Sequence, residues 1–159
     1  MEQQRSQTII LAVLAVGIGA LLLFGFLNRG PDAGTLTGPT WQLASITGQT
    51  PAYQGVIPAA EQSRYTIAFA DDGSFLAKAD CNAVAGTYEL DRRDGITITL
   101  GPSTLVACPD GSYGSLFAHS LGTVTTWAIA DGELTLTTSN GGSGTFVDAS
   151  TAGVVPTAT

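Results

Sequence analysis

Apolar and polar side chains alternate along most of residues 40–147, which is the two-residue period of β-strands. The clearest stretches read TWQLASI, SRYTIAF, GITITL, VTTWAIA and ELTLTT. Tight-turn signals separate them, including Asp72-Gly73, Asp131-Gly132 and Asn140-Gly141. Short strands joined by such turns predict a meandering antiparallel sheet, with Trp41 and Leu43 facing the core.

Two stretches depart from this period. In residues 109–124 the apolar positions fall at helical spacing and predict one helix of about three turns, laid across a curved sheet. Residues 47–62 contain two prolines and no sustained period, so we expect a loop there. Long loops are frequent binding elements, which makes Tyr53 a candidate for a ligand or partner surface.

The N-terminal segment 8–27 reads TIILAVLAVGIGALLLFGFL and contains no charged side chain. Twenty helical residues at about 1.5 Å each span roughly 30 Å, the thickness of a bilayer core. A cleaved signal peptide is the alternative, but its apolar stretch covers about 7–15 residues and ends in small side chains. Here bulky Phe26 and Leu27 end the run. We therefore expect an uncleaved signal-anchor helix and a single-pass membrane protein.

The segments flanking the strand pattern have no core-forming residues at a regular period. Gly, Pro and Thr dominate residues 28–39, which predicts a flexible linker, and the small residues of 148–159 predict a disordered tail. The expected organisation is a cytoplasmic N-terminus (1–7), a transmembrane helix (8–27), a linker (28–39), an extracytoplasmic domain (40–147) and a tail (148–159).

The part of the chain after Gly30 is acidic, with twelve Asp and Glu residues against four Lys and Arg residues, a net charge of −8. Nucleic-acid binding needs a basic surface, and so does attraction to anionic lipid headgroups. Nucleic acid is therefore excluded as a partner. We expect the partners to be the membrane, through residues 8–27, and an envelope protein or ligand that the sequence does not identify.

Cys81 and Cys108 are the two cysteines of the chain. A catalytic thiol needs a base, and the single histidine, His119, lies on the predicted helix. A metal site needs about four ligands, more than these three residues supply. An exported domain lies in an oxidising compartment, which favours a disulfide between the two cysteines. Free structural thiols and a reactive Cys81 are the alternatives.

Carboxylates and tryptophans are weaker candidates for chemistry. An enzyme built on Asp80 and Glu89 would need a carboxyl group with a raised pKa in a cleft. Trp41 and Trp127 are expected in the core, with the lining of a ligand cavity as the alternative, so Trp127 joins Tyr53 as a candidate ligand surface. The sequence has no recognisable nucleophile–base pair, metal-ligand set or phosphate loop. We expect a non-enzymatic protein without a metal or cofactor.

A series of spaced signatures runs along residues 40–147. They are Trp41-Gln42-Leu43, Tyr65 to Phe69 before Asp72-Gly73, Cys81-Asn82 followed by Gly86-x-Tyr88, Thr104 to Cys108, and Leu134-Thr135-Leu136. Taken in order, they resemble the META domain, the family that includes the HslJ heat-shock-associated lipoproteins. Two positions depart from the family pattern. Asp80 precedes Cys81 where the family often has Gly or Met, and Val106 replaces the methionine of a T-x-M-x-C segment.

The resemblance implies an α+β fold, in which a curved antiparallel sheet approaches a half-open barrel and carries one packed helix. It supports the pairing of Cys81 with Cys108, and it marks a set of family positions: Trp41, Asn82, Gly86, Tyr88 and Thr104. For function it implies an association with envelope and heat-shock stress, and it maps no catalytic residue. We expect a membrane-anchored binding module, with carriage of a small apolar ligand in the half-barrel as the alternative. Any role of the motif methionine does not transfer to Val106.

Overall fold

The computed structural model describes residues 36–49, 52–91 and 93–151. The predicted membrane span at 8–27 lies outside these residues, as do the predicted N-terminus at 1–7 and the end of the predicted tail. Within the described ranges, no helix is both long enough and apolar enough to cross a bilayer.

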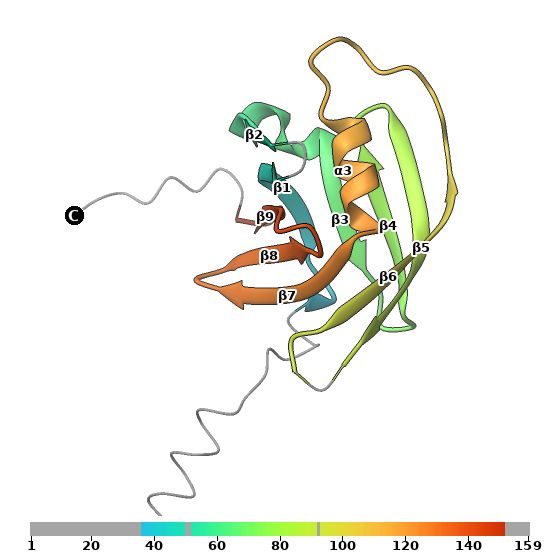
Figure 1. Ribbon diagram of the computed structural model, residues 1–159, viewed down its shortest axis with the longest axis vertical. Helices are drawn as coiled ribbons and strands as arrows, with labels where there is room; N and C mark the ends of the chain where they lie inside the picture. Colours follow the sequence, from blue (N-terminus) through green and yellow to red (C-terminus); the bar gives the residue numbers. More distant parts are fainter. Residues whose placement is uncertain (1–35, 50–51, 92, 152–159) are drawn as a thin grey trace, which may run out of the picture. The chain divides into compact units, whose positions relative to one another are not determined.

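The described domain is a single antiparallel sheet of nine strands with one α-helix (Figure 1). The strands are β1 (Thr40–Gln49), β2 (Ala52–Val56), β3 (Tyr65–Phe69), β4 (Ser74–Ala79), β5 (Asn82–Leu90), β6 (Ile96–Ser103), β7 (Val124–Ala130), β8 (Glu133–Thr138) and β9 (Ser143–Asp148). Their order across the sheet is β6-β5-β4-β3-β1-β9-β8-β7, and β2 pairs with β1. This confirms the predicted antiparallel sheet.

The sheet curls until its two edge strands, β6 and β7, approach each other. Gly95 and Thr126 form an isolated antiparallel bridge, and the backbone N–H of Trp127 donates a hydrogen bond to the carbonyl of Asp94 over 2.8 Å. Within the part of the chain that the structure describes, β6 and β7 are bridged only near this point, so the sheet is a half-open barrel. The predicted α+β class and curved sheet are confirmed.

The helix α3 (Gly114–Leu121) packs its buried face, Phe117 and Leu121, against the inside of the curled sheet. The Phe117 ring lies 5.9 Å from that of Phe146 on β9. The helix has eight residues, so it is shorter than the predicted three turns. The reason lies before Gly114, where Gly111 adopts a left-handed φ of 81° and the chain cannot yet be helical.

The prediction of a loop over residues 47–62 is wrong. β1 continues to Gln49, β2 pairs with it, and a 3₁₀ helix η1 (Ala59–Arg64) leads into β3. A cross-strand pair explains the error. Gly48 lies opposite Tyr53, and a Cβ at Gly48 would stand 2.1 Å from the Tyr53 ring, so the ring occupies the space of the missing side chain. A strand with glycine at its packing positions has no two-residue apolar period to recognise.

The folded domain also extends beyond the predicted boundaries at both ends. Leu36, expected in the linker, is fully buried, and its carbonyl accepts a 3.0 Å hydrogen bond from Trp41 Nε1. Asp148, expected in the tail, ends β9, and the N–H of Ala149 donates to the carbonyl of Thr40. Single residues such as these carry no periodic signal, which is why the sequence pattern missed them.

Candidate functional site at the disulfide end of the sheet

Two segments that are distant in sequence meet at one end of the sheet. The two-residue turn Asp80-Cys81 joins β4 to β5, and the segment 104–113 links β6 to α3 and arches over the same end (Figure 1). Cys81 and Cys108 are bonded, with a Cα–Cα distance of 5.6 Å. The predicted disulfide is confirmed. We call the group Arg64, Asp80, Cys81, Asn82, Thr104 and Cys108 the disulfide end.

Asn82 fixes the segment beyond the disulfide by bonding to the backbone of Val106. Its Oδ1 accepts from the Val106 N–H over 2.7 Å, and its Nδ2 donates to the Val106 carbonyl over 2.8 Å. The side-chain amide therefore satisfies both backbone groups of one residue, as a neighbouring strand would.

Thr104 extends this connection to β5. Its hydroxyl donates to Asn82 Oδ1 over 3.0 Å and accepts from the backbone N–H of Ala83 over 2.9 Å. Its own N–H donates to the carbonyl of Ala83. Together with Asn82 and the disulfide, Thr104 holds residues 104–108 against the end of β5.

Asp80 anchors the turn from the other side. Its φ of 63° lies in the left-handed region, where a residue other than glycine is strained. Both carboxylate oxygens accept 2.8 Å hydrogen bonds from Arg64, one from Nε and one from Nη2. A hydrogen bond from Ser112 and, after it, the Arg64 guanidinium lower the pKa of Asp80, although burial opposes them. A lowered pKa is the opposite of what an enzyme acid at Asp80 would need.

The outcome of these bonds is an exposed apolar segment. The side chain of Leu105 is 93% exposed and that of Val106 is 61% exposed, and Ala107 is exposed beside them. We call Leu105, Val106 and Ala107 the apolar strip. Its backbone is held by the disulfide end while its side chains point into solvent.

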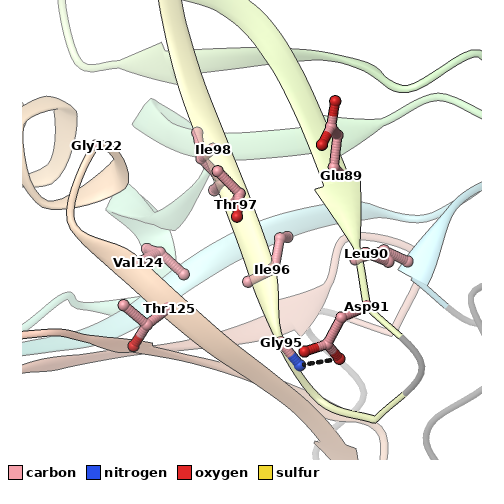
Figure 2. Close-up of a pocket in the computed structure, with 10 residues that line it drawn as sticks. All are labelled: Glu89, Leu90, Asp91, Gly95, Ile96, Thr97, Ile98, Gly122, Val124 and Thr125. Atoms are coloured by element: carbon pink, nitrogen blue, oxygen red, sulfur yellow. Dashed lines mark hydrogen bonds between the residues drawn. The ribbon is translucent and has the colours of Figure 1, made fainter.

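A second feature is a hollow of about 390 Å³ at the seam between β6 and β7 (Figure 2). Ile96, Ile98 and Val124 form its apolar wall, with Glu89 and Asp91 at the rim. The Asp91 carboxylate accepts hydrogen bonds from the backbone N–H groups of Arg93 and Gly95 in the same turn. These bonds lower the pKa of Asp91. Among the residues that line this hollow, Glu89 and Asp91 carry the groups that could bind a ligand or transfer a proton. Asp91 is already hydrogen-bonded within its own turn.

Comparison with known protein families gives a match to the META domain over residues 34–151. The chain belongs to the META domain family. The matched span starts and ends within two residues of the described domain and includes Leu36, which the sequence pattern alone had left in the linker.

Two solved structures resemble the fold of this META domain. An NMR structure of a protein from Burkholderia xenovorans has a TM-score of 0.56 at 23% identity, covering 76% of this chain and 92% of that one. A DUF4847 family protein from Bacteroides vulgatus has a TM-score of 0.50 at 17% identity, covering 70% and 93%. At these identities the likeness concerns the fold alone. No curated protein matches the sequence.

The other META family positions, Trp41, Gly86 and Tyr88, stabilise the sheet to which the disulfide end belongs. A Cβ at Gly86 would stand 2.2 Å from the Thr99 carbonyl oxygen, so only glycine lets β5 and β6 approach there. The Tyr88 hydroxyl donates to the Ala70 carbonyl over 2.8 Å, and burial raises the pKa of this phenol. Trp41 is buried, and its Nε1 bonds the carbonyl of Leu36, which is also buried.

The structure separates the residues that were candidates for a ligand surface. Tyr53 is half-buried on β2, whereas Trp127 lies on β7 at the edge of the sheet and is only 2% exposed. Trp127 therefore forms no part of the outer surface. Its Nε1 is buried without a hydrogen-bond partner among the described residues.

His119 is exposed on α3, as expected for a surface residue. Within the described part of the chain, no three His, Cys, Asp or Glu side chains gather closely enough to hold a metal ion.

Sequence reasoning missed Arg64 and the apolar strip. Arg64 lay in the predicted strand segment SRYTIAF, 16 residues from Asp80, and no local spacing signals such a pair. Leu105 stood out in no periodic pattern, although a Leu-Val-Ala run between two turn-rich segments was visible.

Proposed function

We propose that this META domain protein is a membrane-anchored, extracytoplasmic binding module of the HslJ-like type that acts in envelope or heat-shock stress and catalyses no reaction. The apolar segment 8–27 supports the anchor. The Cys81–Cys108 bond supports an oxidising compartment, because disulfides persist outside the cytoplasm. The family resemblance to heat-shock lipoproteins supports the association with stress.

One observation carries the preference for binding over catalysis. The polar groups of Asn82, Thr104 and Asp80 are engaged in holding backbone and turn, and what they hold is an exposed apolar strip. A catalytic site places its polar groups where they can reach a substrate. A binding site needs a preorganised contact surface, and this is what the disulfide end supports.

The test is thiol labelling of the full-length protein in intact cells with a membrane-impermeant reagent. The proposal expects no labelling of either cysteine in intact cells until a membrane-impermeant reducing agent is added, followed by labelling of Cys81, which is exposed in the folded domain. Ready labelling without reduction, or labelling only after the membrane is broken, would contradict the extracytoplasmic placement.

A second candidate function, the carriage of a small ligand, is favoured by the unpartnered Nε1 of Trp127. A ligand that offered a hydrogen-bond acceptor there would remove a desolvation cost of about 1–3 kcal/mol. Trp127 and Trp41 are the two tryptophans, so a ligand that enters the barrel should change the intrinsic fluorescence. Carriage predicts that a panel of apolar acceptor ligands raises the melting temperature of the wild type and not of Trp127→Phe. If no ligand does so, carriage is excluded.

A further inference from the structure

We infer that the apolar strip is the anchor by which this protein docks into an apolar pocket of another envelope protein. The inference rests on the proposed function, because it assumes an extracytoplasmic binding module and names the surface that binds. It goes beyond that function in assigning the contact to Leu105, Val106 and Ala107.

The apolar strip combines exposed side chains with a backbone that is held in place. Leu105 is the most exposed large apolar side chain among the residues described, at 93%, and two more apolar residues follow it directly. Exposed hydrophobic loops are ordinarily mobile, since nothing holds them. Here both backbone groups of Val106 are bonded to Asn82, and the disulfide closes the segment two residues later.

Fixation of this kind matters for binding. A segment that is already ordered loses little conformational entropy when a partner takes it up, so more of the apolar contact appears as affinity. Burial of an exposed Leu side chain in an apolar pocket is itself favourable. The contacts of the disulfide end contribute nothing to burying the strip, so its side chains are left for an external contact.

Other exposed apolar residues lack this setting. Leu76 is 61% exposed, and Val56 is 69% exposed. Each sits on the outer surface of a strand with polar neighbours along the chain, Lys78 near Leu76 and Gln54 near Val56. Single exposed apolar residues are normal on protein surfaces. Leu76 is therefore a matched control for the strip.

The charge of the chain points to a protein pocket as the occupant. The chain has a net charge of −7, and Asp110 follows the strip closely. Such a surface repels both anionic lipid headgroups and a second copy of itself. A pocket with an apolar floor and a neutral or basic rim is complementary to it. Three side chains also cover only part of the about 800 Å² per partner of a standard interface, which suits an anchor rather than a flat dimer face.

The strip lies at the end of the sheet opposite to the start of β1. The register pairs Thr40, where β1 begins, with Ala68, and pairs Tyr65 with Ala79 at the opposite end of β3. Ala79 precedes the Asp80-Cys81 turn. The chain therefore enters the sheet at one end, and the strip lies at the other.

The test is site-specific photo-crosslinking of the full-length protein in its native cells. The photoreactive residue p-benzoylphenylalanine replaces Leu105, Leu76, Tyr53 or Leu116, one at a time. The inference expects a protein adduct of discrete mass from position 105 and none from position 76. The adduct should disappear when Asn82→Ala frees the segment, while the variant still shows an intact disulfide.

Quantitative binding then decides the assignment. The protein captured at position 105 is purified, and its affinity is measured for the wild type, for Leu105→Ser/Val106→Ser and for Leu76→Ser. We expect at least a tenfold loss for the strip variant and less than a twofold change for Leu76→Ser. Equal affinities of wild type and strip variant would overturn the inference.

Other outcomes identify other occupants. Binding to phosphatidylcholine or phosphatidylglycerol vesicles that the strip variant loses would assign the strip to lipid and overturn the inference. Self-association that this variant loses would do the same in favour of a second copy. Adducts at position 53 or 116 but not at 105 would overturn the inference and leave a binding module. Absence of adducts at all four positions would overturn the proposed function as well.

Discussion

Two hairpin turns of this domain place an aspartate in the left-handed backbone region, and they differ in what surrounds that residue. Asp131, with φ of 53°, joins β7 to β8 and is followed by Gly132. Asp80, with φ of 63°, joins β4 to β5 and is followed by Cys81. Both are the first residue of a two-residue turn and both have a positive φ, although the residue after Asp131, Gly132, also has a positive φ and Cys81 does not.

The difference lies in the side chains. In the described structure the Asp131 carboxylate has no hydrogen bond or ion pair, and its turn is a local chain reversal. At the other turn, Asp80 bonds Arg64, Cys81 bonds Cys108, and Asn82 bonds Val106. The last two of these connections lead to residues 104–108. The extra bonds therefore fix that segment, since a hairpin turn by itself needs none of them.

The largest expected effect comes from removing the disulfide. Cys81 and Cys108 are 27 residues apart, and the chain-entropy model gives about 3.5 kcal/mol for a closed loop of this length. Cys81→Ser/Cys108→Ser should lower the free energy of unfolding by that order in urea titration. As a control, a reducing agent should destabilise the wild type to a similar degree and leave the double variant unchanged. A loss below about 1 kcal/mol would mean that the disulfide does not hold this end.

The next effect compares two asparagines. Asn82 bonds residues more than 20 positions away, whereas Asn140 accepts only from Thr138 and Gly142 within its own turn. Asn82→Ala should cost about 2 kcal/mol, since it removes two hydrogen bonds to the Val106 backbone that are each worth about 0.5–1.5 kcal/mol net. Asn140→Ala should cost about 1 kcal/mol or less. Urea unfolding measures both, and equal losses would contradict a special role for Asn82.

A smaller effect concerns acid. The pKa of Asp80 is lower in the folded state than in the unfolded state. The stability that the carboxylate contributes is therefore fully present above its unfolded pKa, about 3.9, and is lost as the pH falls through its lower folded pKa. Asp80→Asn should be less stable than the wild type by about 1 kcal/mol at pH 6, after allowance for solvent screening. The gap should close below pH 4, and a gap that stays constant from pH 6 to pH 3 would rule out this contribution.

The smallest effect is at the plain turn. Asp131→Gly relieves left-handed strain but adds freedom to the unfolded chain, and these terms are each about 1 kcal/mol and opposite. The net change should lie within about 0.5 kcal/mol. Asp80→Gly undergoes the same backbone change and also loses the Arg64 pair, so it should be the more destabilised of the two in thermal melts. The reverse order would contradict the contrast between the turns.

Much of the sheet was predictable because its strands show a two-residue period and its turns carry Asp-Gly or Asn-Gly. The disulfide was predictable as well, because two cysteines in a domain that is expected to be exported leave few alternatives. The strand β2 was not, since Gly48 and Gly55 replace the apolar residues that would have marked a period. Leu36 was missed for a similar reason, as one buried residue makes no pattern.

The sequence identified most residues of the disulfide end, but it did not predict how they bond to one another. Cys81, Asn82, Thr104 and Cys108 were recognised by family resemblance. The pairing of the Asn82 amide with the Val106 backbone joins residues 24 positions apart, and no sequence spacing signals it. At the left-handed φ of Asp80, glycine, one of the two residues that the resemblance places before the first cysteine, would be free of strain, whereas methionine, the other, would not.

The most direct test of the account is amide hydrogen exchange at Val106 in the oxidised full-length protein. The account predicts that this N–H, although its side chain is 61% exposed, exchanges at least tenfold more slowly in the wild type than in Asn82→Ala. Equal, fast exchange in both proteins would show that the segment is not held, and the fixed apolar strip would no longer be a property of this molecule.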